Sequence, residues 1–391
     1  MKIAMYNLTT TSRFGGVETF VWEISRELAR RGEEVHIIGG EGKVQNDYPG
    51  VSVRRFPFIP RNRVPNLGSR FRKLVERWSF GWKAFSYLRG ERYDIFHIHK
   101  PYDLPVGVFL QKKGKTRLIL GSHGGDFFWA DAYWAKKADA VVCCSDYNAG
   151  EIKERYGLKP VVIYNGINPE LFRPVSADPE LSREMRQRER RFRLIYAGRL
   201  IGLKGVGELI EAMAFLGKDF PVQLTIIGEG EAREELGRRA AMLGLEKDVF
   251  FRGFVPNRDL PRHYSVADVG VFPSVADETF GISICEAMAC GRPVVTTRVG
   301  GIPEVVQDGE TGYLAEPRNP RDLAQKIGLL LKDENLRKKM GEKARERVLK
   351  FFTWEKVGDR LMPVYERVLK GNHDSALNRH SENGNGRIEE P

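Results

Sequence analysis

The chain has 391 residues, of which 41% are hydrophobic, and a formal net charge of +11. This length and composition favour two globular domains over one. No charged segment followed by an apolar one opens the chain, and no stretch of about eighteen apolar residues occurs, so we expect a cytoplasmic protein that does not span a membrane.

The alternation of strand and helix signals begins at the first residues. The apolar runs KIAMY, EVHIIGG, DIFHIHK, RLILGSHGG, AVVCCS and VVIYNG predict strands, and VETFVWEISRELARRG predicts a helix after the first of them. This order predicts a mainly parallel sheet with helices on both faces, within a first domain over residues 1–168.

Most of the positive charge lies in residues 54–92, which hold 11 Lys and Arg against 2 Asp and Glu, a net charge of +9. Phe71, Trp78 and Trp82 fall on one face of a predicted helix there. A basic helix with such aromatic residues is typical of binding to an anionic membrane surface. A core helix with a solvated basic face explains the pattern equally well, and no recognisable nucleic-acid module is present.

The four cysteines do not have the spacing of a disulfide framework or of a zinc site. Cys143 and Cys144 are adjacent, and Cys285 and Cys290 lie in an apolar helical run. We therefore expect four reduced, mostly buried thiols.

Residues 165–179 are rich in Pro and Asn and predict a hinge, after which a second strand–helix series begins. We expect a second doubly wound domain over residues 169–353, and a cleft between the two domains where ligands meet the carboxyl ends of the strands. The helix at 354–370 is predicted to pack back on the first domain, and the tail 371–391, with almost no apolar residues, is predicted to be disordered.

Several motifs together resemble the retaining glycosyltransferases of family 4. They are SHGGD, AGRLIGLKG, DETFGISICEAMACGRP, VGGIPEVV and DGETGYL, and the resemblance covers about residues 1–370. It implies an α/β protein with the GT-B fold, that is, two Rossmann-like domains. It also implies transfer of a sugar from a nucleotide-diphosphate sugar to a hydroxyl acceptor, with retained configuration and with neither metal nor cofactor.

Two groups of residues are candidates for binding the diphosphate. Arg199 and Lys204 follow a predicted strand, and fixed cations there stabilise the charge that develops on a departing phosphate. Gly15 and Gly16 begin the first helix, where backbone N–H groups favour an anion, although a flexible turn explains these glycines equally well.

Glu278 and Glu286 are more suited to neutral hydroxyls than to phosphate, which would be repelled by a like charge. A carboxylate accepts hydrogen bonds from a vicinal diol such as that of ribose. The resemblance implies that Glu278 holds the hydroxyls of the donor sugar and that Glu286 holds the ribose. The intervening Phe280, Gly281 and Ile282 present N–H groups at a helix start. The alternatives are a helix-terminal acid for Glu278 and a buried pair with an arginine, such as Arg292, for Glu286.

His123 follows an apolar strand of the first domain, and the resemblance implies that it contacts the donor sugar. His97 and His99 alternate on one strand, and without a third ligand nearby we interpret them as packing or supporting residues. The resemblance places the nucleobase against the backbone near Val255.

Two mechanisms can retain configuration: double displacement through a carboxylate nucleophile, and attack on the same face as the leaving group. The resemblance favours the second, in which the departing phosphate takes the acceptor's proton and Glu278 has a positioning role.

The alternatives are a sugar-nucleotide epimerase or a phosphorylase on the same fold, and a non-catalytic protein that binds through its basic segment. The expected partners are a nucleotide-diphosphate sugar, a hydroxyl acceptor that is lipid-linked or part of a surface glycan, and an anionic membrane surface.

Overall fold

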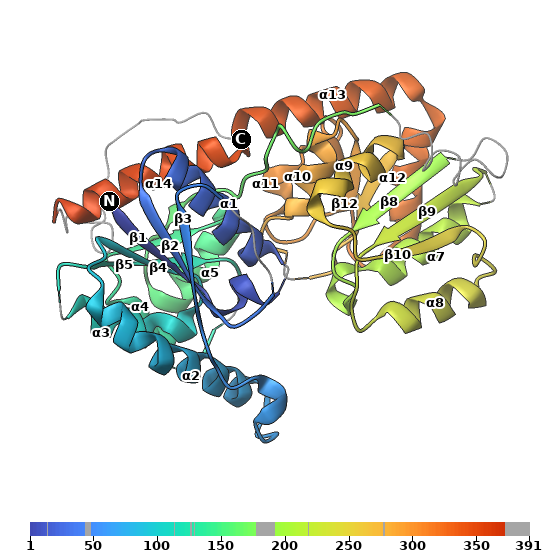
Figure 1. The fold of residues 1–391 in the computed structure, drawn as a ribbon. Helices are drawn as coiled ribbons and strands as arrows, with labels where there is room; N and C mark the ends of the chain where they lie inside the picture. The colour runs from blue at the N-terminus through green and yellow to red at the C-terminus, as the bar shows by residue number, and fades with distance from the viewer. Residues whose placement is uncertain are drawn as a thin grey trace. The chain divides into compact units, whose positions relative to one another are not determined.

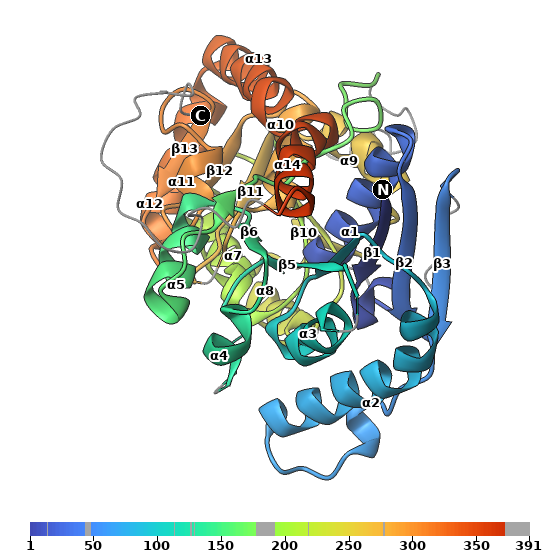
Figure 2. The same cartoon turned by 90° about the vertical axis from the view of Figure 1, so that its left-hand side faces the viewer.

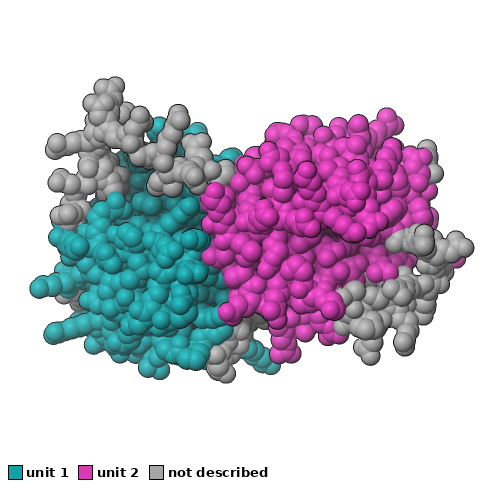
Figure 3. Space-filling view, turned by 90° about the horizontal axis from the view of Figure 1, so that it is seen from above, with its two compact units in different colours: residues 1–165, 354–388 teal, residues 166–353, 389–391 magenta. Residues whose placement is uncertain are grey.

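The protein consists of two compact units, which Figure 3 colours separately. The computed structural model describes residues 1–13, 15–43, 48–112, 114–125, 127–128, 130–176, 192–217, 219–276 and 278–371. Unit 1 holds Met1–Asn165 and the helix that begins at Trp354, and unit 2 holds Gly166–Thr353. Residues 177–179 of the predicted hinge and residues 372–391 of the predicted tail lie outside the described residues.

Unit 1 is built on a seven-stranded parallel sheet in the order β3-β2-β1-β4-β5-β6-β7 (Figure 1). The strands are β1 (Lys2–Tyr6), β2 (Glu34–Gly40), β3 (Val51–Phe56), β4 (Ile95–Ile98), β5 (Arg117–Ser122), β6 (Ala140–Cys143) and β7 (Val161–Val162). Its helices are α1 (Gly16–Arg30), α2 (Ser69–Gly90), α3 (Leu104–Gln111), α4 (Asp131–Ala135), α5 (Asp146–Tyr156) and α14 (Trp354–Leu369).

Alternate side chains of β1 pack into two separate hydrophobic cores, one on each face of the sheet. Ile3 and Met5 pack with α1 and α14 on one face of the sheet, whereas Ala4 and Tyr6 pack with α2 and α3 on the other. Figures 1 and 2 both show α2 beside α3. Helix α14, the last of the chain's described helices, is therefore part of the first unit's core. At the surface, Arg31, directly after α1, donates to Asp359 at 2.9 Å.

Unit 2 contains a six-stranded parallel sheet in the order β10-β9-β8-β11-β12-β13. The strands are β8 (Phe192–Ala197), β9 (Val222–Ile227), β10 (Val249–Gly253), β11 (Val269–Phe272), β12 (Val294–Thr297) and β13 (Gly312–Ala315). The helices are α7 (Val206–Leu216), α8 (Arg233–Met242), α9 (Leu260–Val266), α10 (Ile282–Ala289), α11 (Ile302–Val305), α12 (Pro320–Lys332) and α13 (Glu334–Phe351).

Both sheets reverse their winding direction at one point. In unit 1 the chain winds outward in opposite directions from the neighbouring strands β1 and β4, and in unit 2 from β8 and β11. Ligands of such sheets bind outside the carboxyl ends of the strands at these reversal points. The predicted fold class, two doubly wound Rossmann-like domains, is confirmed.

Two further predictions concern burial. All four cysteines are buried, reduced thiols, as expected. Within the part of the chain that the structure describes, no helix is long and apolar enough to cross a membrane.

Candidate active site

The reversal point of unit 2 is lined by polar side chains from the loops that follow β8 and β11. Lys204, in a short 3-10 turn after β8, forms an ion pair with Glu278, which follows β11. Ser274, two residues beyond β11, donates from Oγ to Glu278 Oε2 at 3.3 Å. The structure thus brings together two of the predicted residues that lie 74 positions apart.

The close approach of these loops requires glycine. Gly205 ends the turn that carries Lys204, with a φ of 67°, and a Cβ there would lie 1.8 Å from the carbonyl oxygen of Pro273. The backbone N–H of Val275 donates to Leu203 O at 2.9 Å across the same contact. Because no other residue fits at Gly205, this last glycine of AGRLIGLKG keeps Lys204 beside Glu278.

Arg199 adds a second cation to this edge. It lies two residues beyond β8 and its side chain is exposed, without an ion-pair partner among the described residues. Its carbonyl oxygen accepts a 3.0 Å hydrogen bond from the Tyr196 hydroxyl. Burial, together with the negative charge of Glu278, raises the pKa of Tyr196. The guanidinium is therefore held on an ordered backbone and faces solvent, where an anion can reach it.

The segment between the two glutamates forms the start of α10. Phe280 is buried against Phe352, with ring centroids 5.4 Å apart. Gly281 adopts a φ of 94° and precedes the first helical residue, Ile282. The N–H of Gly301 donates to the carbonyl oxygen of Glu278 at 2.9 Å and fixes the loop before this helix. The N-terminus of α10 therefore stands at the carboxyl edge of the sheet, where its dipole favours anions and sugar oxygens.

Glu286 lies inside α10 with only 5% of its surface exposed. Its carboxylate accepts a 3.3 Å hydrogen bond from the Tyr264 hydroxyl of α9, and burial raises its pKa to about 8. The alternative of a pair with Arg292 is not seen, because Arg292 donates to the carbonyl of Ala267 at 2.9 Å. With this one weak donor among the described residues, the nearly buried carboxylate has unused acceptor capacity, since an ionised carboxylate can accept several hydrogen bonds.

The remaining predicted residues lie elsewhere. Val255 is half-buried two residues beyond β10, the outermost strand on its side of the sheet. In unit 1, Gly15 and Gly16 begin α1, but a Cβ on Gly15 would lie 2.6 Å from Oε2 of Glu18. That carboxylate, which accepts a hydrogen bond from Thr9, already occupies the helix start. A phosphate there would meet its like charge.

His123 follows β5 at the carboxyl edge of the unit 1 sheet and is half-buried. Its ring packs 4.7 Å from that of Phe20, and its Nε2 lies 3.1 Å from Nδ1 of His99. Burial lowers the pKa of His123 to about 3, so the imidazole is neutral at physiological pH. It can exchange hydrogen bonds with a ligand but carries no charge.

Sequence reasoning missed three residues of these sites. Ser274 directly follows the apolar run VGVFP, and a polar residue at a strand's carboxyl end is a signal that could have identified it. Tyr264 and Tyr196 have no such local signal. Each belongs to the site only because the fold brings it close to a glutamate, Glu286 for Tyr264 and Glu278 for Tyr196.

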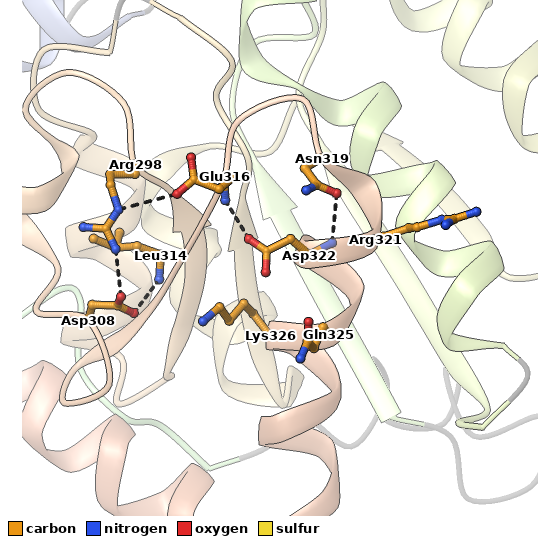
Figure 4. Close-up of a pocket in the computed structure, with 9 residues that line it drawn as sticks. All are labelled: Arg298, Asp308, Leu314, Glu316, Asn319, Arg321, Asp322, Gln325 and Lys326. Carbon is orange, nitrogen blue, oxygen red and sulfur yellow. Dashed lines mark hydrogen bonds and ion pairs between the residues drawn. The ribbon is translucent and has the colours of Figure 1, made fainter.

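A separate surface hollow of about 580 Å³ opens beside β13 and α12 (Figure 4). Two of its acidic side chains are already engaged: Asp308 pairs with Arg298 at 2.9 Å, and Asp322 accepts from the backbone N–H of Glu316 at 2.7 Å. None of the predicted residues lines it. Size alone does not indicate a site, and the polar groups at the reversal point are better suited to a ligand.

Comparisons with known proteins identify the family of the chain. The family described as glycosyl transferases group 1 matches residues 178–347, and Glycosyltransferase Family 4 matches residues 14–171. A D-inositol 3-phosphate glycosyltransferase of Streptomyces bingchenggensis is 31% identical over 414 residues, which cover 95% of this chain and 90% of the relative.

Two solved structures share the fold. A sucrose-phosphate synthase from Thermosynechococcus elongatus matches with a TM-score of 0.82 and 23% identity, over 95% of this chain and 99% of that one. Anabaena HepE, solved with UDP-glucose, matches with a TM-score of 0.76 and 22% identity, over 94% of this chain and 99% of that one. The chain belongs to the group 1, family 4 glycosyltransferases, which makes it an enzyme of the hexosyltransferase type with the GT-B fold.

Proposed function

We propose that this glycosyltransferase moves a hexose from a nucleotide-diphosphate sugar to a hydroxyl acceptor with retention of configuration and without a required metal ion. Glu286 is the observation that carries the proposal. A nearly buried carboxylate with unused acceptor capacity is costly unless a ligand donates to it, and a ribose diol offers two O–H donors.

The cations at the same edge support a diphosphate leaving group. Arg199 is exposed, and Lys204 donates one of its three N–H groups to Glu278, which leaves the others for phosphate oxygens. The N-terminus of α10 adds backbone N–H groups. We assign Phe280, Gly281 and Ile282 to this contact, and the backbone of Val255 to the nucleobase. Gly15 and Gly16 stay predictions for a phosphate contact, which would require the Glu18 carboxylate to leave the helix start. His123 stays a prediction for a contact to the transferred sugar.

In the proposed reaction, the bond between the anomeric carbon and the diphosphate oxygen breaks first. Arg199 and Lys204 stabilise the negative charge that develops on that oxygen. The acceptor hydroxyl then bonds to the same face of the anomeric carbon, and its proton passes to the departing phosphate. Glu278 does not act as a nucleophile here, because Lys204 and Ser274 already hold its carboxylate, and that pairing supports a role in positioning the sugar's hydroxyls.

Thermal-shift measurements can identify the donor nucleotide, and release of nucleoside diphosphate can show the transfer reaction. A bound ligand raises the melting temperature because it binds only the folded state, so UDP, GDP and ADP sugars should be compared. With the matching donor, we expect release of nucleoside diphosphate that depends on added acceptor. An interconverted sugar nucleotide without acceptor would instead identify an epimerase. Release that EDTA abolishes would contradict metal independence.

The acceptor is proposed to be presented at an anionic membrane surface, to which α2 binds. One face of α2 is buried in unit 1 through residues such as Phe80 and Leu88. The opposite side exposes Trp82 by 82%, Trp78 by 51% and Phe71 by 40%, among basic side chains. The helix therefore combines both interpretations of its sequence: an inner core face and an outer aromatic, basic face suited to a lipid interface.

Cosedimentation with vesicles tests this surface. We expect binding to vesicles with anionic lipid, little binding to neutral ones, and loss of binding in a Trp78→Ser/Trp82→Ser double variant. Tyr133→Ser, which removes another exposed aromatic residue of unit 1, is the matched control. Equal, negligible binding to both kinds of vesicle would exclude the membrane and leave a dissolved acceptor.

A further inference from the structure

A row of three histidines crosses the middle of the unit 1 sheet. His97 lies in β4, His99 just beyond it, and His123 just beyond β5. The rings of His97 and His99 stack with centroids 4.4 Å apart, and Nδ1 of His99 lies 3.1 Å from Nε2 of His123. At the far end, Nδ1 of His97 lies 2.7 Å from the hydroxyl of Tyr365 in α14.

Within the described part of the chain, no group of three or more His, Cys, Asp or Glu side chains, including these histidines, is placed to hold a metal ion. Each Nδ1 of the first two histidines is engaged by a different neighbour, Tyr365 for His97 and His123 for His99. Their Nε2 atoms are both buried, and neither has a hydrogen-bond partner among the described residues. Each of these two imidazoles therefore makes one hydrogen bond, through Nδ1.

That arrangement decides where the protons lie. Burial holds the pKa of His97 at about 3 and that of His99 well below its usual value, so both rings are neutral and carry one proton each. A buried N–H without an acceptor is rarer in proteins than a buried acceptor without a donor. The proton of His99 therefore belongs on Nδ1, which donates to His123, and Nε2 of His123 is the acceptor.

We propose that His99 is a positioning residue, which holds the single proton of His123 on Nδ1 and so makes that nitrogen a hydrogen-bond donor. This inference rests on the proposed function, in which His123 contacts the transferred sugar. A donor at Nδ1 matches an acceptor oxygen of a neutral sugar. The opposite tautomer would present a bare nitrogen there and would require a hydroxyl proton instead.

The surroundings of the row keep it in this geometry. A Cβ on Gly121 would lie 2.7 Å from Nε2 of His97 and 3.1 Å from Nδ1 of His99, so only glycine leaves room for both rings. Phe20 packs against His123 at 4.7 Å and against Trp354, the first residue of α14, at 5.8 Å. Helix α14 thus supports the row at both ends, through Trp354 by way of Phe20 and through Tyr365.

Nitrogen-15 NMR of the full chain, labelled at its seven histidines, tests the inference directly. Two-bond proton–nitrogen correlations distinguish the two neutral tautomers, and single substitutions assign the signals. We expect His123 to carry its proton on Nδ1 in the wild type and in His99→Asn, whose amide N–H can replace the donor. In His99→Leu we expect the proton to move wholly or partly to Nε2. A wild-type His123 with its proton on Nε2 overturns the inference, whether or not any variant folds.

Kinetics supply the functional readout. His99→Leu should lower kcat about tenfold, the effect of losing one aligned hydrogen bond, with the KM for the donor nearly unchanged, and His99→Asn should recover most of the loss. His36→Phe is the matched control, since His36, like His99, is buried and forms a hydrogen bond through Nδ1, in its case with the Tyr93 hydroxyl at 2.9 Å, but it lies in β2. Equal losses in His36→Phe and His99→Leu would show a merely structural effect and overturn the role. If the wild type transfers no sugar, the proposed function fails while the NMR result still decides the tautomer.

Discussion

If Glu286 holds the ribose as proposed, its protonation state should be coupled to nucleotide binding. Its pKa is about 8 because the carboxyl is buried, whereas an unfolded glutamate titrates near 4.5. A ribose diol donates to the ionised form, so binding of a nucleotide should release a proton below pH 8. We expect nucleotide affinity to rise with pH between about 6 and 8, by up to tenfold per pH unit.

Calorimetry in two buffers with different ionisation enthalpies measures this release. Glu286→Gln removes the titrating group, so its affinity should be lower and independent of pH over the same range. The substitution keeps the shape of the side chain and the hydrogen bond with Tyr264. A wild-type affinity that does not change with pH would contradict the assignment of Glu286 to the ribose.

Glu278 should separate turnover from nucleotide affinity. It sits in an ion pair with Lys204 and accepts from Ser274, and its proposed partner is the sugar, not the nucleotide. Glu278→Gln should therefore lower kcat about a hundredfold, as loss of one positioned electrostatic group does in other active sites, and leave the Kd for the free nucleoside diphosphate within about threefold. Lys204→Met, the companion variant, should weaken diphosphate binding as well. Steady-state kinetics with parallel titration of the nucleoside diphosphate would distinguish the two variants. A larger effect of Glu278→Gln on the Kd than on kcat would refute the positioning of the sugar by Glu278.

Helix α2 is anchored by an ion pair that is almost completely buried. Arg77 of α2 pairs with Asp103, which precedes α3, and their side chains are 2% and 1% exposed. Arg77 also donates to the side-chain oxygen of Asn7 at 3.3 Å, just beyond β1. The guanidinium thus joins the outer helix to the reversal point between β1 and β4.

Removing one member of this pair leaves a buried charge without its partner, which costs about 3–5 kcal/mol. We expect Asp103→Ala to lower the free energy of unfolding by that amount in urea titrations. The double variant Arg77→Met/Asp103→Leu should recover most of the loss, because apolar residues of similar volume often replace a buried pair at little cost. Equal stability of Asp103→Ala and the wild type would mean that the pair does not hold α2.

The two-sheet architecture and the loops that carry Arg199 and Lys204 could be predicted from sequence, because apolar runs and glycine-rich turns are local signals. The Arg77–Asp103 pair could not, since a basic residue in a basic helix looks solvated until the fold buries it. Likewise the hydrogen bond between Tyr264 and Glu286 joins two helices through tertiary packing alone. Local pattern therefore finds a strand's carboxyl end, but which side chains meet there depends on the packing of distant elements.

At the level of the whole molecule, the two units should respond to pH in opposite directions. In unit 1, His97 and His99 are buried and His123 is half-buried; the pKa values of His97 and His123 are both about 3, and that of His99 is also lowered. Below about pH 6.5 these histidines bind protons in the unfolded chain but stay neutral in the folded one, so unit 1 loses stability as the pH falls. In unit 2, Glu286 keeps its proton up to about pH 8, whereas the unfolded form releases it near 4.5. Unit 2 therefore loses stability as the pH rises between these values.

Tryptophan fluorescence can separate the two responses, because all six tryptophans of the sequence lie outside residues 166–353 of unit 2. As the pH rises from about 5 to 6.5, we expect the urea midpoint of unit 1, followed by fluorescence, to rise. Over the same range the urea midpoint of unit 2, followed by circular dichroism, should fall. Each titrating group changes the free energy of unfolding by at most about 1.4 kcal/mol per pH unit. Glu286→Gln should abolish the shift of the unit 2 transition and leave the fluorescence midpoint unchanged. A fluorescence midpoint that falls over this range would contradict neutral, buried histidines in unit 1, and a unit 2 transition that stays fixed in the wild type would contradict the raised pKa of Glu286.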